Sequence, residues 1–309
     1  MDHAHPLRPI VHRPSLQRLR RYLGLTKPGI ILGNGIAALG GFLLAARGEI
    51  DPAYLMLTLL GIGLVVASGC VLNNVIDRDI DRLMVRTRQR AMARGEIAPG
   101  SAFLYALVLG TTGLGLLLAQ TNTLTFLVVL AGLIVYVGPY SLRTKRQSVH
   151  GTLVGSLAGA TPALAGYTAV HGQIDAGAVL LFLMFCLWQV PHSYAIAMHR
   201  STDFRTAGIP LAPLRLGASA ARRQIFAYVA AFTAVAASMT FTGYTGAGYL
   251  LVIGAIGAYW LLLAAQGFDP EDETGLRTWA RRQFTFSVLA ISLVSLMLAI
   301  NYVPRAHFG

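Results

Sequence analysis

The chain has 309 residues, of which 55% are hydrophobic and only 12% are charged, and its mean hydropathy is +0.59. Soluble globular proteins carry roughly a quarter of charged residues, so this composition excludes a soluble domain and indicates an all-α helix bundle in a membrane. The formal net charge of +12 would suit a nucleic-acid partner, but the position of the basic residues gives a different explanation.

The N-terminal segment is polar and basic and lacks the apolar core of a cleavable signal peptide. We expect residues 1–21 to form a flexible cytoplasmic tail, and His3, His5 and His12 to belong to that tail rather than to a metal site. A single membrane domain is expected over residues 22–303, followed by a short C-terminal tail of residues 304–309.

Nine apolar stretches long enough to cross a bilayer follow the tail. They cover about 29–46, 53–75, 101–119, 123–141, 151–170, 177–198, 224–243, 246–265 and 284–302. The connections between them are too short for a soluble domain. The two cysteines, Cys70 and Cys186, lie inside apolar stretches and have no metal-ligand spacing, so we expect small buried hydrophobic side chains.

The basic residues are concentrated on one side of the predicted bundle. With the N-terminus in the cytoplasm, 23 of the 25 Lys and Arg residues fall in the N-terminal segment and in 76–100, 142–150, 199–223 and 266–283. Only Arg47 and Arg305 fall on the other side. The positive-inside rule therefore predicts a cytoplasmic N-terminus and a periplasmic C-terminus. It also removes the need for a nucleic-acid partner, while basic loops would attract anionic membrane lipid or an anionic substrate.

An unusual acidic run, "NNVIDRDID", ends the second predicted span. On a helix, Asn73, Asp77 and Asp81 are spaced i, i+4, i+8 and share one face, with Asn74 beside that face and Asp79 pointing elsewhere. Clustered oxygen ligands suit Mg²⁺, which takes one or two carboxylates and completes its shell with phosphate oxygens and water. Carboxylates this close repel each other unless a cation or arginines offset them.

Basic side chains on the same side of the membrane complete a possible polyanion site. Arg78 and Arg82 interleave with the acids, Lys145 and Arg146 follow the fourth span, and Lys27 precedes the first. Arginine suits bidentate phosphate contacts. A loop that merely obeys the positive-inside rule would explain the arginines, but it would not explain the asparagines and aspartates at the membrane boundary.

A third polar run, "CLWQVPHSYAIAMHRSTD", ends the sixth span. Polar and ionisable groups within a span usually face the bundle interior and mark function, which points to Trp188, His192 and Tyr194. His192 has three open roles: metal ligand, proton carrier or structural helix contact. His199 is a weaker candidate, and Asp203 lies just beyond the span, where it is expected to join the cytoplasmic acidic site.

These stretches together resemble the UbiA superfamily of intramembrane prenyltransferases, whose first motif, N-D/N-x-x-D-x-x-x-D, reads NNVIDRDID here. The longer string "NNVIDRDIDRLMVRTRQR", with "TKPGI", "GTLVGSLAGATPALAGY" and "LWQVPHSYAIAMHR", is similar to its protoheme IX farnesyltransferase branch. The resemblance runs from about Tyr22 to the ninth span.

The resemblance implies nine helices around a central cavity that opens to the cytoplasm, in a bacterial inner membrane. It implies Mg²⁺-dependent transfer of the farnesyl group of farnesyl diphosphate, with addition of water, to a vinyl group of heme b, giving heme O and diphosphate. Heme O would serve terminal oxidases or become heme A, so a heme A synthase or an oxidase assembly is a candidate partner.

The resemblance also implies roles for individual residues. Asn73, Asp77 and Asp81 match the positions that hold Mg²⁺ on the diphosphate. Other superfamily members carry a second acidic motif at the end of the sixth span, where this chain offers only one clear acid, Asp203. The chain therefore departs from the pattern that holds a second carboxylate-bound Mg²⁺. We expect His192 to serve heme recognition. The full set of expected site residues is Asn73, Asp77, Asp81 and Arg78 for catalysis, and Lys27, Asn74, Arg82, Lys145, Arg146, Trp188, His192, Tyr194 and Asp203 for substrate.

Two other functions compete with this interpretation. The first is a UbiA-type enzyme that prenylates an aromatic acid or quinone precursor, which should show the second acidic motif. The second is a transporter, which often shows inverted repeats and interrupted helices. No convincing repeat is visible in the chain, and its aspartates lie at a membrane edge rather than in the middle of a span.

Overall fold

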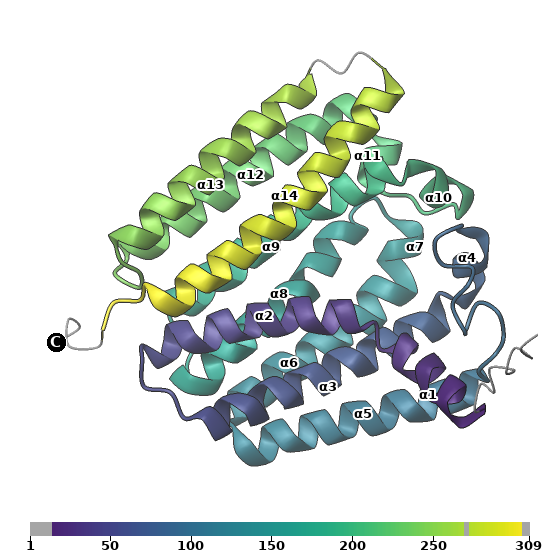
Figure 1. The fold of residues 1–309 in the computed structure, drawn as a ribbon, viewed down its shortest axis with the longest axis horizontal. Helices are drawn as coiled ribbons and strands as arrows, with labels where there is room; N and C mark the ends of the chain where they lie inside the picture. Colours follow the sequence, from purple (N-terminus) through teal and green to yellow (C-terminus); the bar gives the residue numbers. More distant parts are fainter. Residues whose placement is uncertain (1–13, 269–271, 305–309) are drawn as a thin grey trace, which may run out of the picture.

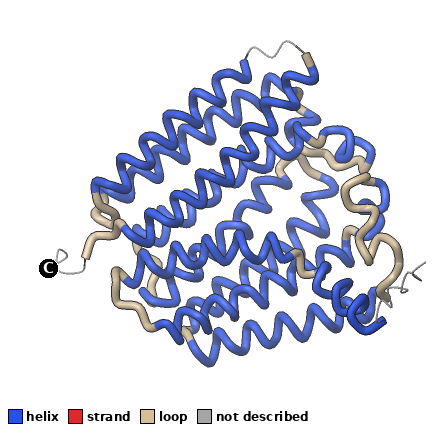
Figure 2. Tube along the Cα trace, in the orientation of Figure 1, coloured by secondary structure: helices blue, strands red, loops and turns tan. Residues whose placement is uncertain are grey.

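The protein is helical throughout the part of the chain that the computed structural model describes, residues 14–268 and 272–304. Figures 1 and 2 show a single layered bundle of long helices with short helices and loops at its ends. Within these residues the β-structure is limited to one isolated bridge between Thr245 and Tyr302. The all-α class predicted from the sequence is confirmed.

Nine helical segments of the described chain are long and apolar enough to cross a membrane. They are α2 (Pro28–Ala46), α3 (Pro52–Ile76), α5 (Pro99–Gln120), the run Thr123–Gln147, α8 (Gly151–His171), α9 (Ala176–His199), α12 (Ala218–Phe241), α13 (Ala247–Ala265) and α14 (Glu273–Ile300). The nine predicted spans are thereby confirmed. Two of them begin earlier than predicted, α12 at Ala218 instead of 224 and α14 at Glu273 instead of 284, because both helices continue into polar sequence at the same end of the bundle.

Four short helices lie together at one end of the bundle (Figure 1). They are α1 (Pro14–Leu25), α4 (Arg78–Leu83), α10 (Ser201–Thr206) and α11 (Ala212–Arg215), and a 3₁₀ turn, η2 (Gln266–Phe268), follows α13. The described parts of the segments that are expected to be cytoplasmic therefore lie at this end.

The long helices begin where the sequence offers capping residues. Asp51, Asn122, Asp175 and Asp272 each accept a backbone N–H of the helix that follows. Prolines occupy the first turn of α2, α3 and α5, where the missing N–H removes a donor that would lack a partner anyway.

Helices α2 and α8 cross with their backbones in direct contact. A β-carbon on Gly41 of α2 would lie 2.1 Å from the carbonyl oxygen of Ala163, and one on Gly166 of α8 would lie 2.0 Å from that of Ala38. Both glycines are therefore required by the closeness of the helices, as is common where packing rather than hydrophobicity drives association in lipid. The contact fixes α2 at the centre of the bundle, and α2 follows directly after Lys27.

The largest hydrophobic core lies between α8, α9, α12, α13 and α14. Its biggest fully buried side chains include Trp260, Tyr249 and Phe232. Buried aromatic N–H groups in this core have partners: Trp260 Nε1 donates to Gln283 Oε1 at 2.7 Å, and Trp279 Nε1 donates to the carbonyl of Leu263 at 2.8 Å. The core therefore gives α9, which bears Trp188, His192 and Tyr194, a fixed position against α14.

The fourth span changes its helical geometry near the site. After α6 (Thr123–Val135), residues Tyr136–Thr144 form a π-helix, η1, and α7 (Lys145–Gln147) ends the segment. Tyr136 and Tyr140 stack within it, with ring centroids 5.7 Å apart. Such wide turns are rare and frequently occur at functional sites. Here the π-helix delivers Ser141, Lys145 and Arg146 to the end of α3.

Candidate active site

The three residues of the acidic motif lie at the junction of α3 and α4. Helix α3 ends at Ile76 and α4 begins at Arg78, so the single continuous helix assumed from the sequence is interrupted at Asp77. The helical spacing nevertheless survives, because Asp77 N–H donates to the Asn73 carbonyl at 2.9 Å and Asp81 N–H donates to the Asp77 carbonyl at 2.8 Å. Asn73, Asp77 and Asp81 are buried, with 1–3% of their surface exposed.

Two lysines from distant parts of the chain converge on Asn73 and Asp77. Lys27 Nζ donates to Asn73 Oδ1 at 2.5 Å, and Lys145 Nζ donates to Asp77 Oδ2. Asn73 in turn donates its Nδ2 to Asp77 Oδ2 at 2.8 Å and to Ser141 Oγ at 3.2 Å. A buried carboxylate is expensive unless it is paired and hydrogen-bonded, and these contacts supply that compensation.

Lys27 adopts an uncommon backbone conformation. Its φ of 53° and ψ of 70° lie in the left-handed region, and the residue immediately precedes Pro28 at the start of α2. A non-glycine residue rarely takes such angles without a compensating contact, and the hydrogen bond to Asn73 provides one. Burial lowers the pKa of the Lys27 ammonium to about 8, so this side chain stays protonated at neutral pH but is more easily neutralised than a surface lysine.

Arg146 connects the same end of α3 to Asp79. Its guanidinium makes two hydrogen bonds to the Asp79 carboxylate, at 2.7 and 2.8 Å, and one to the Ile76 carbonyl at 2.6 Å. The hydrogen bonds from Arg146 hold the pKa of the Asp79 carboxyl at about 2. Asp79, expected to point away from the acidic face, thus positions a basic residue 3.6 Å from Asp77 Oδ1.

Asp81 has a separate basic partner, Arg90. Their side chains form an ion pair at 2.8 Å, and Thr87 donates its hydroxyl to the Asp81 carbonyl at 3.0 Å. Arg82 turns to the loop instead and donates its Nε to the Ala93 carbonyl at 2.7 Å. The segment between α4 and α5 is therefore folded back over the acidic motif.

Two buried atoms of this cluster, Asp77 Oδ1 and Arg146 Nε, have no hydrogen bond within the described residues. Asp77 Oδ1 has only the Arg146 guanidinium nearby, at 3.6 Å, although Oδ2 of the same carboxylate is fully used. A buried carboxylate oxygen without a donor fits a cation that completes the site when it binds. In the described part of the chain, no three His, Cys, Asp or Glu side chains gather as a metal cage.

Two further residues of the motif bond to the backbone. Asn74 lies on the other side of α3 and donates its Nδ2 to the carbonyls of Leu25 and Cys70, each at 2.9 Å. Arg78 is exposed, and its contact with the Val75 carbonyl is long, at 3.4 Å. Asn74 thus ties the end of α1 to α3, while the guanidinium of Arg78 remains accessible to a ligand.

The polar residues of α9 face α14 and the core. Trp188 Nε1 donates to the Ser287 carbonyl and His192 Nδ1 shares a hydrogen bond with Ser287 Oγ, both at 2.8 Å. The two rings stack with centroids 4.7 Å apart and an interplanar angle of 26°. Tyr194 is 4% exposed and belongs to the main core. Trp188 and His192 therefore form one aromatic unit whose orientation is fixed by Ser287.

Asp203 approaches the acidic motif from α10. Its Oδ1 accepts the backbone N–H of Val85 at 3.1 Å, which joins α10 to the segment that follows α4. His199 lies near the C-terminus of α9, and its Nδ1 has no hydrogen-bond partner among the residues that the structure describes. The structure thus brings Asp203, from the polar run that ends the sixth span, close to the segment after the acidic motif. It shows no direct bond between Asp203 and the carboxylates of Asp77 or Asp81.

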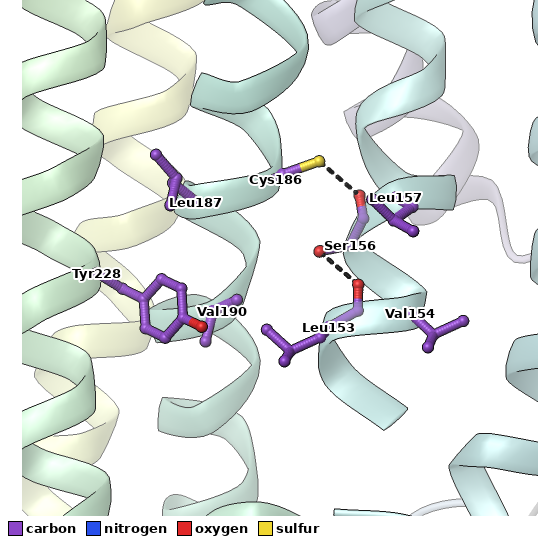
Figure 3. A pocket seen from close by; sticks show the side chains of 8 residues that line it. All are labelled: Leu153, Val154, Ser156, Leu157, Cys186, Leu187, Val190 and Tyr228. Atoms are coloured by element: carbon purple, nitrogen blue, oxygen red, sulfur yellow. Dashed lines mark hydrogen bonds between the residues drawn. The ribbon is translucent and has the colours of Figure 1, made fainter. Parts of the chain in front are cut away.

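An apolar cavity of about 300 Å³ lies apart from this polar cluster, between α8, α9 and α12. Figure 3 shows Leu157, Val190 and Tyr228 around it, with the Cys186 thiol bonded to the Ser156 carbonyl. None of the predicted site residues lines it. The cavity therefore adds no polar group to the site at the end of α3.

Comparison with known proteins identifies the kind of chemistry that such a site serves. Residues 34–300 match the model of the UbiA prenyltransferase family. The chain belongs to the UbiA prenyltransferase family. It is therefore a membrane prenyltransferase, as predicted from its motifs.

Curated relatives of this prenyltransferase match it over nearly their full length. It is 50% identical over 292 residues to protoheme IX farnesyltransferase 2 of Pseudomonas aeruginosa strain PAO1, which covers 94% of this chain and 98% of the relative. It is 48% identical over 291 residues to protoheme IX farnesyltransferase of Photorhabdus laumondii, with the same two coverages. The family branch suggested by the motifs agrees with these relatives.

Solved structures share the fold of this prenyltransferase at low identity. One, described as digeranylgeranylglyceryl phosphate synthase, superposes with a TM-score of 0.73 at 19% identity and covers 91% of this chain and 99% of its own. A UbiA homolog from Archaeoglobus fulgidus bound to GPP and Mg²⁺ superposes with a TM-score of 0.70 at 20% identity, covering 90% and 99%. These two structures support the bundle architecture.

Sequence reasoning missed part of the polar network of this prenyltransferase. Arg90 and Ser141 were absent from the expected site residues, yet one pairs with Asp81 and the other hydrogen-bonds to Asn73. Ser141 carried no visible signal, because an isolated serine in an apolar helix is unremarkable. Arg90 stood in a run of arginines, and nothing in the sequence showed which of them would meet Asp81.

Proposed function

We propose that this prenyltransferase transfers the farnesyl group of farnesyl diphosphate, with addition of water, to a vinyl group of heme b, giving heme O and diphosphate. The observation that carries the proposal is the 50% identity, over 94% of the chain, to a protein named protoheme IX farnesyltransferase 2. The match covers 98% of that relative as well.

The diphosphate would bind over the junction of α3 and α4. Asn73, Asp77 and Asp81 are the residues that would hold Mg²⁺, and the unpartnered Oδ1 of Asp77 is the atom that most needs such a partner. When bound, Mg²⁺ neutralises negative charge on the diphosphate. The UbiA homolog from Archaeoglobus fulgidus, solved with GPP and Mg²⁺, supports a prenyl diphosphate and a divalent cation as ligands of the family.

The basic residues around the motif would stabilise the leaving group. As the bond between farnesyl C1 and oxygen breaks, negative charge grows on the diphosphate, and fixed cations already aimed at that place lower the barrier. Lys27, Lys145 and Arg146 now contact Asn73, Asp77 and Asp79. Each has donors in excess of those contacts, so each can share its charge with a bound diphosphate.

The acceptor would bind near α9. The vinyl group of heme b attacks farnesyl C1, and water then captures the resulting cation with loss of one proton. Trp188 and His192 form an oriented aromatic surface against α14 that suits the flat, apolar face of a porphyrin. Tyr194 would support that surface from the core. Asp203 would contribute the one carboxylate of the polar run that ends the sixth span.

The membrane arrangement follows from charge. Of the 25 Lys and Arg residues, 23 fall in segments predicted to be cytoplasmic, and the described parts of these segments lie at one end of the bundle. This end would face the cytoplasm of a bacterial cell and the inner membrane would hold the enzyme. Residues 22–303 would be the catalytic domain, with tails at 1–21 and 304–309. Helix α1 (Pro14–Leu25) crosses the first of these boundaries, and residues 1–13 and 305–309 lie outside the described part of the structure. Heme O would pass to a terminal oxidase or to a heme A synthase.

The test uses purified protein supplied with heme b, farnesyl diphosphate and Mg²⁺. We expect a heme product whose mass has increased by one farnesyl group plus one water, and we expect EDTA to abolish it and added Mg²⁺ to restore it. A product with farnesyl but without the oxygen of water would reject the hydration step. Turnover with an aromatic or quinone-precursor acceptor, and none with heme, would retain the diphosphate site and reject the heme assignment.

A further inference from the structure

Helix α1 is a short helix with an apolar face that no other part of the described chain covers. Leu16, Leu19 and Leu23 are each about half exposed, at 50%, 54% and 48%. Their spacing of three and four residues places them within roughly 60° of one another on the helix. They form a continuous apolar strip on the surface of a helix whose other residues are largely polar.

The opposite side of α1 is attached to the protein body. Leu25 is 2% exposed, Tyr22 meets Tyr105 of α5 edge-to-face at 5.3 Å, and Arg21 pairs with Glu96 at 3.1 Å. These contacts fix the rotation of α1 about its axis. The leucine strip therefore points away from the bundle, not into it.

The surroundings of the strip indicate what covers it. On α5, the helix against which Tyr22 packs, Phe103, Leu104 and Leu107 are also exposed, at 55%, 60% and 50%. These α5 side chains lie at the start of a membrane-spanning helix, so lipid is their solvent. Figure 1 shows α1 at the end of the bundle where α5 begins and the basic loops gather. Because Tyr22 packs on Tyr105, the exposed leucines of α1 lie next to this lipid-facing part of α5.

Charge on α1 favours an anionic lipid surface. Arg18 and Arg20 are exposed, and neither forms an ion pair with any described residue. At roughly 100° per residue, Arg20 lies beside the leucine strip and Arg18 lies on the polar side of the helix. An amphipathic helix with leucines on one face and free arginines on its polar side lies in the plane of the membrane interface and prefers anionic headgroups.

We propose that α1 is an interfacial helix: Leu16, Leu19 and Leu23 insert between the lipids of the cytoplasmic leaflet, and Arg18 and Arg20 bind anionic headgroups. The helix is tied directly to the active site. Asn74 holds the Leu25 carbonyl beside Asn73, and only Thr26 separates Leu25 from Lys27. Lipid bound to α1 therefore holds the segment that presents the Lys27 ammonium.

The test measures where α1 lies in the membrane and needs no enzymatic turnover. The full chain, with Cys70 and Cys186 replaced by alanine, would carry one nitroxide label at L19C or, as matched control on another face of the same helix, at Q17C. Each protein is placed in nanodiscs of phosphatidylcholine with phosphatidylglycerol. Collision of the label with oxygen, which concentrates in lipid, is compared with collision with a water-soluble nickel chelate.

The proposal expects the L19C label to collide more with oxygen and the Q17C label more with nickel. Equal exposure of both labels to nickel would overturn it. The charge-reversal variant R18E/R20E should shift the L19C label toward water. It should also reduce the phosphatidylglycerol that remains bound in native mass spectrometry. The matched variant R215E, on exposed Arg215 of α11, should leave both readouts unchanged, and an equal loss of lipid in R215E would reject the role of the α1 arginines.

Discussion

Asp77→Asn is the substitution that most directly tests the polar cluster. It replaces a buried carboxylate with a neutral amide of the same shape and removes the ion pair with Lys145. It also makes the oxygen that faces the expected cation a weaker ligand. Removing one preorganised charged group from such a site typically lowers kcat by about 10²–10³-fold, or about 2.7–4 kcal/mol. Breaking a buried ion pair from one side also destabilises a fold by about 3–5 kcal/mol. This range is an upper limit here, because the Lys145 side chain is 17% exposed and water can solvate its charge.

Asp79→Asn is the matched control, with the same chemistry two residues away. Asp79 makes two good hydrogen bonds to Arg146, yet its side chain is 62% exposed, so its ion pair contributes only about 0–1 kcal/mol. Farnesylated heme formation and thermal unfolding would be measured for both variants in the same detergent. Asp77→Asn should lose nearly all activity while Asp79→Asn keeps most of it. Equal losses, or full activity in Asp77→Asn, would refute the assignment of Asp77 to the diphosphate site.

Three further substitutions test the fold, the pairing at Asp81 and the acceptor surface. Gly166→Ala should lower the thermal midpoint, because its β-carbon would meet a backbone oxygen at 2.0 Å. The expected loss of folding free energy is about 1–3 kcal/mol. The control Gly254→Ala, in open space on α13, should be neutral or slightly stabilising. Arg90→Ala should lower activity and cost about 1–3 kcal/mol by leaving a buried carboxylate unpaired, whereas Arg94→Ala, whose side chain is 55% exposed, should do neither. His192→Ala should raise the KM for heme with little change in the KM for farnesyl diphosphate; unchanged heme kinetics would reject its role in heme recognition.

The sequence predicted the spans well because apolar length is a local property. It predicted the ends of α12 and α14 less well, because their first turns are polar and the helices are extended by packing and, in α14, by the Asp272 cap. The spacing of Asn73, Asp77 and Asp81 was also legible, since residues four apart on a helix share a face.

The partners of these residues could not be predicted in the same way. Lys145 meets Asp77 across 68 positions of sequence, and Lys27 meets Asn73 across 46. Such contacts depend on how the helices pack, on the left-handed turn at Lys27 and on the change from α-helix to π-helix in the fourth span. None of these has a periodic signature in the sequence.

The π-helix at Tyr136–Thr144 also constrains how the length of this chain can vary. A π-helical turn contains more residues than an α-helical turn, because its hydrogen bonds join residues five apart instead of four. In an α-helix, each residue rotates the direction of the next side chain by roughly 100°. Deleting a single residue from this segment would let it relax to an ordinary helix and would rotate Lys145 and Arg146 away from Asp77 and Asp79. Single substitutions that keep Ser141, the partner of Asn73, would leave both cations in place, whereas a change of one residue in length would remove both cations from the site at once. The number of residues in this segment therefore determines whether Lys145 and Arg146 reach the active site.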